Sequence, residues 1–139
     1  MNAGVVVDTS AAIAILTREA GAAWLGRTLI SADKRHMSTA TYLELAIVLE
    51  ARLGPQAAGA GQRFVRDALI DLVDLDATVA ERALEGWRRF GKGRHRAALN
   101  FGDCFTYGLG LHLGEPILCV GDDFAETDAA ILQPPAGVG

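Results

Sequence analysis

Apolar and polar positions along the chain follow two periods, one typical of buried strands and one typical of amphipathic helices. The β-branched run Val5–Val7 stands between Gly4 and Asp8, a pattern that predicts a short central strand buried on both faces. Weaker patterns of the same kind predict further strands over 36–38, 70–75 and 117–120.

Helical periodicity fills the segments between these strands. Ser10 is expected to cap the first helix and Asn100 the last, and Gly54 should end a long helix that begins at Thr39 or Thr41. The predicted helices cover about 10–16, 19–30, 39–53, 62–69, 77–90 and 101–113. Strands that alternate with helices at this spacing predict an α/β fold with a parallel sheet.

Composition is that of one folded domain. The chain has 139 residues, of which 50% are apolar and 22% charged. We expect a single domain over 1–132 and a loose tail over 133–139, where the sequence becomes QPPAGVG. The N-terminus has no basic start, and no apolar run approaches the ~20 residues that span a bilayer, so neither a secretory signal nor a membrane segment is expected.

The two cysteines, Cys104 and Cys119, lie in apolar surroundings and form no CxxC or Cys/His cluster. This spacing disfavours a structural zinc site and a disulfide scaffold. Two reduced, buried thiols in a cytoplasmic protein are the expected arrangement.

Charge distribution is more informative than net charge. With 13 basic and 17 acidic residues the formal charge is −4, which taken alone argues against a nucleic-acid or membrane binder. Five of the 13 cations nevertheless fall within 88–96, with Trp87 and Phe90 interleaved. Cations neutralise phosphates and aromatic rings stack on bases, so the segment is a candidate RNA-binding wall. A solvated helix end with both aromatic rings facing the core explains it equally well. The candidate residues are Arg88, Arg89, Lys92, Arg94 and Arg96.

Carboxylates follow two of the predicted strands directly. Asp8 follows the first strand, and Asp122 and Asp123 follow the strand over 117–120. The carboxyl ends of parallel strands are where α/β sheets bind ligands. Each of these acids also has a plainer interpretation, as a turn or cap residue in contact with water.

Two further carboxylates lie on predicted helices with no Arg or Lys three or four residues away. Glu44 stands in the apolar segment YLELAIVLEA, and Asp103 stands in LNFGDCFTYGLGLHL. An acid in the first turn is favoured by the helix dipole, which explains Asp103 but not Glu44. Glu44 is either the edge of an amphipathic stripe or a ligand for a cation, because a buried carboxylate without a partner costs several kcal/mol.

Together these acids predict a cation site. Carboxylates that converge raise one another's pKa and repel unless a cation neutralises them. Oxygen ligands without Cys or His suit Mg²⁺ or Mn²⁺ rather than zinc. A divalent ion held by carboxylates is what hydrolysis of a phosphodiester requires.

Four segments together resemble the PIN-domain ribonucleases, and most closely the VapC toxins of bacterial VapBC toxin–antitoxin pairs. In order and spacing they are VVVDTSAAIAIL, TYLELAIVLEARLG, LNFGDCFTYGLGLHLGEPIL and VGDDFAETD, which span about residues 4 to 131. The resemblance implies a three-layer α/β/α sandwich around a central, mainly parallel sheet of four to five strands. It also implies a Mg²⁺-dependent endoribonuclease, with Mn²⁺ as an alternative ion, that cleaves tRNA or ribosomal RNA. The partners that it implies are a VapB-type antitoxin and a second copy of the chain.

The resemblance assigns roles to individual residues of this chain. Asp8 and Asp103 match the principal metal ligands, Glu44 matches a third acid that can act through water, and the fourth acid is Asp123 or Asp122, with Asp123 favoured. Ser10, Asn100 and Thr127 match polar positions around the site, the last of them in a Thr-Asp pair with Asp128. Where relatives often carry Lys before the glycine of the last motif, this chain has Val120.

Two other functions compete with a ribonuclease. One is a PIN-like module that binds RNA or a partner without cleavage. The other is a phosphoacceptor domain of the receiver type, which usually has paired acids after the first strand and a lysine late in the chain. Here Asp8 alone follows that strand and no lysine occurs after Lys92, so the receiver ranks last.

Overall fold

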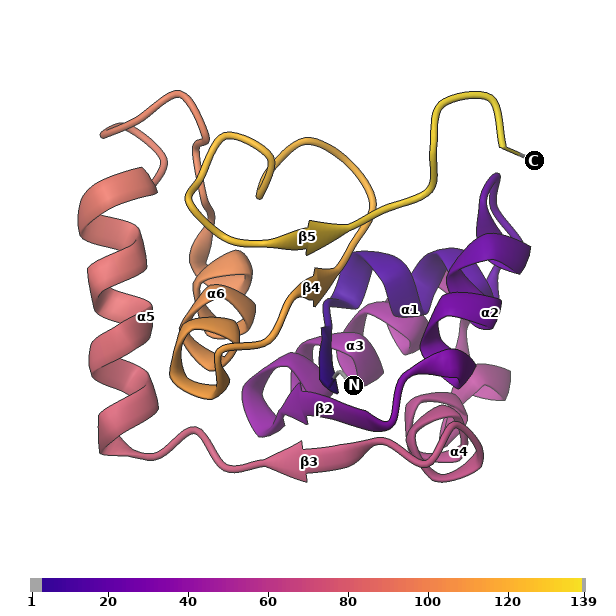
Figure 1. The fold of residues 1–139 in the computed structure, drawn as a ribbon. Coiled ribbons are helices and arrows are strands. Elements are labelled where there is room, and N and C mark those ends of the chain that lie inside the picture. The colour runs from indigo at the N-terminus through magenta and orange to yellow at the C-terminus, as the bar shows by residue number, and fades with distance from the viewer. Residues whose placement is uncertain (1–3, 139) are drawn as a thin grey trace.

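Five parallel strands form the centre of the molecule in the computed structural model, which describes residues 4–138. Their order across the sheet is β3-β2-β1-β4-β5, so the first strand lies in the middle (Figure 1). The strands are β1 (Gly4–Val7), β2 (Lys34–Ser38), β3 (Asp71–Val73), β4 (Ile117–Leu118) and β5 (Ile131–Leu132). This confirms the predicted parallel sheet of four to five strands.

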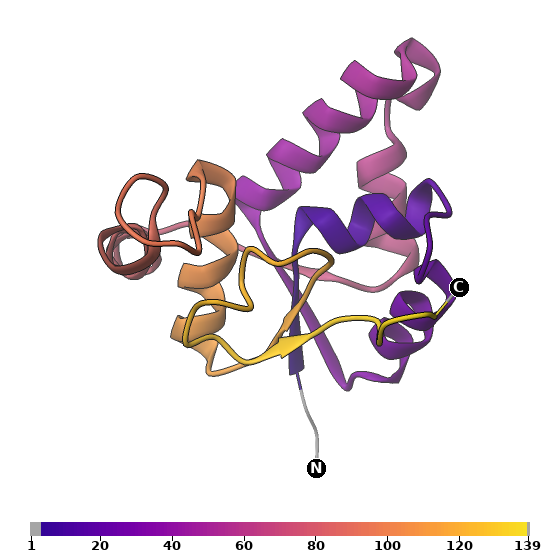
Figure 2. The same cartoon turned by 90° about the horizontal axis from the view of Figure 1, so that it is seen from above.

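Helices cover both faces of the sheet and complete the three layers. Helices α5 and α6 lie on one side, and the other four α-helices lie on the opposite side (Figure 2). The helices are α1 (Thr9–Leu16), α2 (Ala22–Ser31), α3 (Thr39–Leu53), α4 (Ala60–Asp67), α5 (Ala77–Phe90) and α6 (Phe101–Leu113), with a short 3-10 helix at Pro55–Ala57. None of the helices described is long and apolar enough to cross a membrane.

Strand β1 supplies side chains to both faces, as its continuous apolar run predicts. Val5 and Val7 belong to the cluster under α1–α4, whereas Val6 packs with Val79 of α5 and Leu109 of α6. All three valines are at most 1% exposed. The alternation follows from the period of two in a strand, and it explains why no polar residue is found between Gly4 and Asp8.

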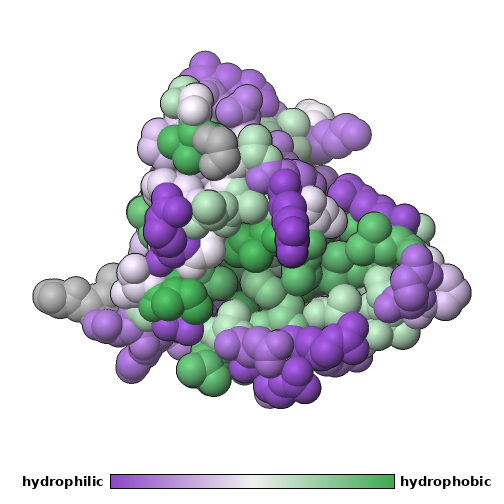
Figure 3. Space-filling model, turned by 90° about the vertical axis from the view of Figure 1, so that its right-hand side faces the viewer, coloured by the Kyte–Doolittle hydropathy of each residue, from purple (hydrophilic) through white to green (hydrophobic). Residues whose placement is uncertain are grey.

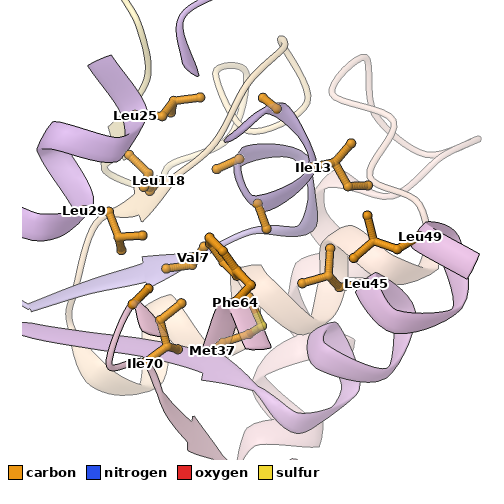
Figure 4. Close-up of a cluster of buried hydrophobic side chains, with 14 of the residues drawn as sticks. Val7, Ile13, Leu25, Leu29, Met37, Leu45, Leu49, Phe64, Ile70 and Leu118 are labelled. Carbon is orange, nitrogen blue, oxygen red and sulfur yellow. The ribbon is translucent and has the colours of Figure 1, made fainter. Parts of the chain in front are cut away.

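The larger core cluster lies between the sheet and α1–α4 (Figure 4). Leu25 and Leu29 of α2, Met37 of β2 and Leu45 of α3 are each at most 2% exposed there. Truncation of such a leucine to alanine costs about 2–5 kcal/mol, because the removed methyl groups leave a cavity. Leu25 and Leu29 therefore belong to the core.

Helices α5 and α6 pack closely through two glycines. A Cβ on Gly86 would lie 2.5 Å from a ring carbon of Tyr107, and a Cβ on Gly108 would lie 2.7 Å from the backbone nitrogen of Ala83. Any side chain at either position would force the helices apart. This contact fixes the helix that carries Asp103.

Several predicted boundaries need correction. Helix α1 begins one residue earlier than expected, and its cap is Asp8 rather than Ser10, because the Asp8 carboxylate accepts the Ser10 backbone N–H. The strand expected over 117–120 pairs over only two residues, and β5 was not predicted. Asn100 caps α6 as predicted.

Candidate active site

The site lies at the carboxyl edge of the sheet, where β1 and β4 end side by side. The Asp8 backbone N–H donates to the Leu118 carbonyl (3.0 Å), which continues the ladder by one residue. Asp8 at the end of β1 and the loop over 119–130 after β4 are therefore neighbours. Parallel pairing of adjacent strands brings together segments that are more than a hundred residues apart.

Asp8 is buried and accepts hydrogen bonds from neutral donors. Its Oδ1 accepts the hydroxyl of Thr106 (2.7 Å), and its Oδ2 accepts the hydroxyl (2.7 Å) and backbone N–H (3.1 Å) of Ser10. The Ser10 hydroxyl in turn accepts the Val120 N–H at 3.0 Å. These contacts fix the carboxylate between α1, α6 and the loop after β4 without neutralising its charge.

Asp103 is held in the first turn of α6 by a reciprocal capping pair with Asn100. Its Oδ2 accepts the Asn100 backbone N–H at 3.1 Å, while the Asn100 amide oxygen accepts the Asp103 N–H at 2.8 Å. This arrangement orients the carboxylate at the helix N-terminus, where the dipole favours negative charge. Asp103 is nevertheless only 8% exposed, so most of its hydration is lost.

Three of the predicted acids, Asp8, Asp103 and Asp123, lie near enough for their charges to act on neighbouring groups of the site. Burial, with the charges of Asp8 and Asp123 and a hydrogen bond with Asp123, raises the pKa of Asp103 to about 7 against the capping interaction with Asn100. Burial also raises the pKa of Asp8, against the hydrogen bonds from Ser10 and Thr106. Burial, together with the charges of Asp8, Asp123 and Asp103, raises the pKa of the Cys119 thiol to about 12. Cys119 therefore lies near all three carboxylates.

Of the two adjacent candidates for the fourth acid, Asp123 is the one whose charge acts on Asp103. The two residues are adjacent and both are exposed, so their spacing alone left the choice open.

Glu44 lies beside the first turn of α6, next to the neighbours of Asp8 and Asp103 in the chain. Its Oε1 accepts the hydroxyl of Thr9 at 2.7 Å, and its Oε2 would lie 2.3 Å from a Cβ on Gly102. Glycine at 102 therefore gives the carboxylate room to lie against the backbone of α6. Glu44 is half-buried, and none of the ion pairs among residues 4–138 includes it.

None of the cations in the described part of the chain forms an ion pair with the site. Within residues 4–138 the ion pairs join His36 to Glu115, Arg66 to Asp67, Arg89 to Asp128 and Arg96 to Glu126, and none includes the four acids. Carboxylates that raise one another's pKa in this way are stabilised by an added cation.

The donor set fits a hard divalent ion that keeps much of its water. Among residues 4–138, no three acidic, histidine or cysteine side chains stand close enough together to hold a metal ion by themselves. Mg²⁺ typically uses one or two carboxylates and completes its octahedron with water and substrate oxygens. Asp8 and Asp103 are a pair of this kind, which fits the prediction that they are the principal ligands and that Glu44 and Asp123 are secondary acids able to act through water.

Hydroxyl groups around the site were partly missed from the sequence. Ser10 and Asn100 contact Asp8 and Asp103 as expected, whereas Thr127 bonds the Phe124 carbonyl and the Ala129 N–H instead. Thr106 was not predicted. It stands three residues after Asp103 on the same side of α6, and that spacing is the signal that could have found it.

The basic segment over 88–96 has mixed contacts. Arg89 pairs with Asp128, Arg96 pairs with Glu126, and the Arg94 guanidinium lies 4.6 Å from the ring centroid of Trp87. Of the two interpretations of the aromatic rings, the one in which they face the core holds for Phe90, which is 8% exposed. Trp87 is 41% exposed.

Comparisons with known proteins agree with this geometry. Residues 5–130 match the PIN domain family model. Ribonuclease VapC30 of Mycobacterium tuberculosis is 44% identical over 94% of this chain and 99% of that protein. The crystal structure of M. tuberculosis VapC20, described as a sarcin-ricin loop cleaving toxin, has a TM-score of 0.74 at 21% identity and covers 94% of this chain and 99% of that one. VapBC2 from Rickettsia felis, solved with a promoter DNA fragment, has a TM-score of 0.69 at 11% identity and covers 95% and 99%.

Proposed function

The chain belongs to the PIN domain family and, within it, to the VapC ribonucleases, and we propose that it is a Mg²⁺-dependent endoribonuclease, the toxin of a toxin–antitoxin pair. One observation carries the proposal. Asp8, Asp103 and Asp123 lie near one another at the carboxyl edge of the sheet, and none of them forms an ion pair among residues 4–138.

The chain's own residues would divide the work of hydrolysis. A bound Mg²⁺ lowers the pKa of water and stabilises charge that develops on the phosphate. Asp8 and Asp103 would hold the ion, with the Thr106 and Asn100 contacts fixing their oxygens. Asp123 would accept a hydrogen bond from a water molecule on the open side. Glu44, placed by Thr9, would orient a second water molecule at the turn of α6.

The substrate that we propose is RNA, with tRNA or ribosomal RNA as the class. Arg88 and Lys92 are exposed and lie in the segment that leads to Asp103. Cations in such a position contact phosphates on either side of the cleaved bond. The stem-loop that VapC20 cleaves is a property of that protein, and the substrate of this chain has to be mapped directly.

An apolar hollow between α1, α2 and α4 is the surface that we propose for a VapB-type antitoxin. It has a volume of about 530 Å³, and Figure 3 shows apolar side chains gathered in it on this face. Its walls include Ile15, Leu16, Leu29, Ile30 and Phe64. Ile30 is 58% exposed although it is apolar, which is typical of a surface that a partner covers.

Exposed apolar side chains on α3 and α6 support a homodimer. Leu43 and Ile47 are each 59% exposed, and Phe101 is 80% exposed. We propose that a second copy covers them and that the protein acts in the cytoplasm, where its two free cysteines stay reduced. Sedimentation of the wild type and of Ile47→Asp should show a dimer and a monomer respectively.

Cleavage of RNA tests the proposal. Purified wild type should cleave bulk tRNA or ribosomal RNA with Mg²⁺ or Mn²⁺ and stop on addition of EDTA. Asp8→Asn and Asp103→Asn should abolish the cut, whereas Asp67→Asn, which changes an exposed acid paired with Arg66, should retain it. Full cleavage by Asp8→Asn and Asp103→Asn would contradict the mechanism.

The competing function is a PIN-like module that binds RNA or a partner without cleavage. RNA that binds the wild type in the presence of Mg²⁺ and Mn²⁺ but is never cut would support this alternative.

Antitoxin binding is tested separately. The product of a short reading frame immediately upstream should form a complex with the wild type and suppress its cleavage. Ile30→Asp, inside the hollow, should weaken the complex, whereas Leu69→Asp, outside it and 74% exposed, should not. Equal binding by both variants would remove the hollow as the docking surface.

A further inference from the structure

The loop over 119–130, which carries Asp123, is fastened to α5 and α6 by one carboxylate. Asp128 accepts the Tyr107 hydroxyl on Oδ1 (2.9 Å) and the Arg89 guanidinium on Oδ2 (3.0 Å). Tyr107 comes from α6 and Arg89 from α5, so each oxygen of Asp128 is bonded to a different helix. Glu126, two residues earlier, pairs with Arg96 in the connection between the same helices.

The loop is also anchored by its own apolar residue. Phe124 is 3% exposed and belongs to the cluster that contains Phe90 and Tyr107. The Thr127 hydroxyl donates to the Phe124 carbonyl at 2.7 Å, which closes a tight turn between the ring and Asp128. Because this part of the loop is fixed on α5 and α6, Asp123 lies on the side of the loop that faces Asp103. Figure 1 shows the loop beside the connection between α5 and α6.

The ion pairs themselves are poorly placed to stabilise the whole fold. The side chains of Arg89 and Asp128 are 46% and 47% exposed, and that of Arg96 is 80% exposed. Exposed pairs contribute little to global stability because water screens them. Their main effect is on the position of the loop, because together with the Tyr107 hydrogen bond they join it to α5, to α6 and to the connection between these helices.

We propose that Asp128 is a positioning residue, which with Arg89, Arg96 and Tyr107 holds the loop so that Asp123 faces Asp103. The proposal rests on the proposed function. It divides the basic segment over 88–96 into two sets. Arg89 and Arg96 fasten the loop, whereas Arg88 and Lys92, which form no ion pair among the residues described, face the RNA.

Two measurements separate the sets. Mn²⁺ binding without RNA, followed by electron paramagnetic resonance, reports the carboxylate site alone. The slope of log affinity against log salt for a single-stranded RNA reports phosphate contacts, because each one contributes about −0.7. Circular dichroism and melting temperature confirm that each variant is folded.

Asp128→Asn and Arg89→Gln should weaken Mn²⁺ binding about tenfold and leave the salt slope unchanged, as expected when a residue that orients a metal ligand is lost. Tyr107→Phe, which removes one hydroxyl from a buried ring, should act in the same direction with a smaller effect. The matched controls Arg88→Gln and Lys92→Gln remove the same charge from the same segment. They should reduce the salt slope by about 0.7 each and leave Mn²⁺ binding at the wild-type value.

The outcomes are distinct from those that test the proposed function. Wild-type Mn²⁺ affinity in Asp128→Asn would overturn the positioning role, even in an active ribonuclease. A lower salt slope with unchanged Mn²⁺ binding in Arg89→Gln would assign Arg89 to the RNA. A wild type that binds Mn²⁺ with the predicted pattern of losses, but cuts no RNA, would contradict the ribonuclease and leave the positioning role supported.

Discussion

Two groups of carboxylates in the molecule differ in what faces them. In the first group, Glu126 and Asp128 each face an arginine. In the second group, Asp8 and Asp103 are buried and receive hydrogen bonds from hydroxyl and backbone N–H groups. Neutral donors fix the direction of a carboxylate but leave its charge in place, which is the condition for binding a cation.

The contrast separates structural acids from functional ones by their partners rather than by their residue type. Glu126 and Asp128 are partly exposed and paired with cations, so their function is to hold a loop. Asp8 and Asp103 are at most 8% exposed and repel each other, so the fold is less stable with them charged. Sites of this kind are retained for function at the expense of stability.

The largest expected effect comes from removing one unneutralised charge. Asp103→Asn should reduce RNA cleavage by at least about a hundredfold, because the metal loses a principal ligand. The metal-free variant should unfold at a temperature no lower than that of the wild type, since a neutral amide is less costly to bury. Cleavage assays and thermal melting measure the two effects, with Asp67→Asn as the exposed control. If Asp103→Asn lowered the melting temperature of the metal-free protein as strongly as it lowers cleavage, Asp103 would be a structural acid and not a functional one.

The next largest effect is on stability against pH. The pKa values of Asp8 and Asp103 are raised in the folded state, to about 7 for Asp103, so between about pH 4 and 7 the folded protein holds protons that the unfolded chain has released. The metal-free protein should therefore gain about 2 kcal/mol of stability as the pH falls from 8 to 5. Urea unfolding in EDTA measures this change.

Mg²⁺ should reverse the trend. At about a hundred times its dissociation constant, the ion should add about 2.7 kcal/mol at pH 8, where the acids are charged, and much less at pH 5. Stability that is the same at both pH values in EDTA would show that the two acids carry no unneutralised charge.

A smaller effect is expected when a neutral donor is removed. Thr106→Val keeps the shape of the side chain but deprives Asp8 of its 2.7 Å hydrogen bond, so cleavage should fall about tenfold through a weaker metal site. The matched control is Thr28→Val, whose hydroxyl bonds the Trp24 carbonyl on α2, away from the site. Equal cleavage by the two variants would show that the donor does not position Asp8.

The smallest effect should come from an exposed pair far from the site. Arg66 and Asp67 are each 69% exposed, so Arg66→Gln should change the free energy of unfolding by less than about 0.5 kcal/mol and leave cleavage unchanged. Chemical denaturation and the RNA assay measure both. A larger change would mean that exposed pairs contribute more to this fold than their screening allows.

The sequence predicts the parts of the site that depend on local pattern. Asp8 follows a β-branched run and Asp103 follows a strong cap, so both could be placed at element ends from the sequence alone. The parallel sheet follows from the alternation of strands and helices. The family resemblance favours Asp123 over Asp122, whereas the residue pattern alone leaves the choice open, because neighbouring loop residues differ only in the direction that the folded loop gives them.

Contacts between distant segments could not be predicted from the sequence. Arg89 and Asp128 are 39 residues apart and meet only because β4, the loop and α5 are packed together. Strand β5 has two residues, too few to show a period. The cap of α1 was assigned to Ser10 because serine is a good cap, whereas Asp8 begins the turn two residues earlier.

Mn²⁺ binding to the wild type and to Asp8→Asn and Asp103→Asn, measured by electron paramagnetic resonance without RNA, tests the central claim most directly. The claim is that the buried, unneutralised pair Asp8 and Asp103 holds a divalent cation. We predict saturable binding to the wild type and to Asp67→Asn, and loss of that binding in both site variants. Undiminished binding in Asp8→Asn and Asp103→Asn, or no binding to the wild type, would contradict it.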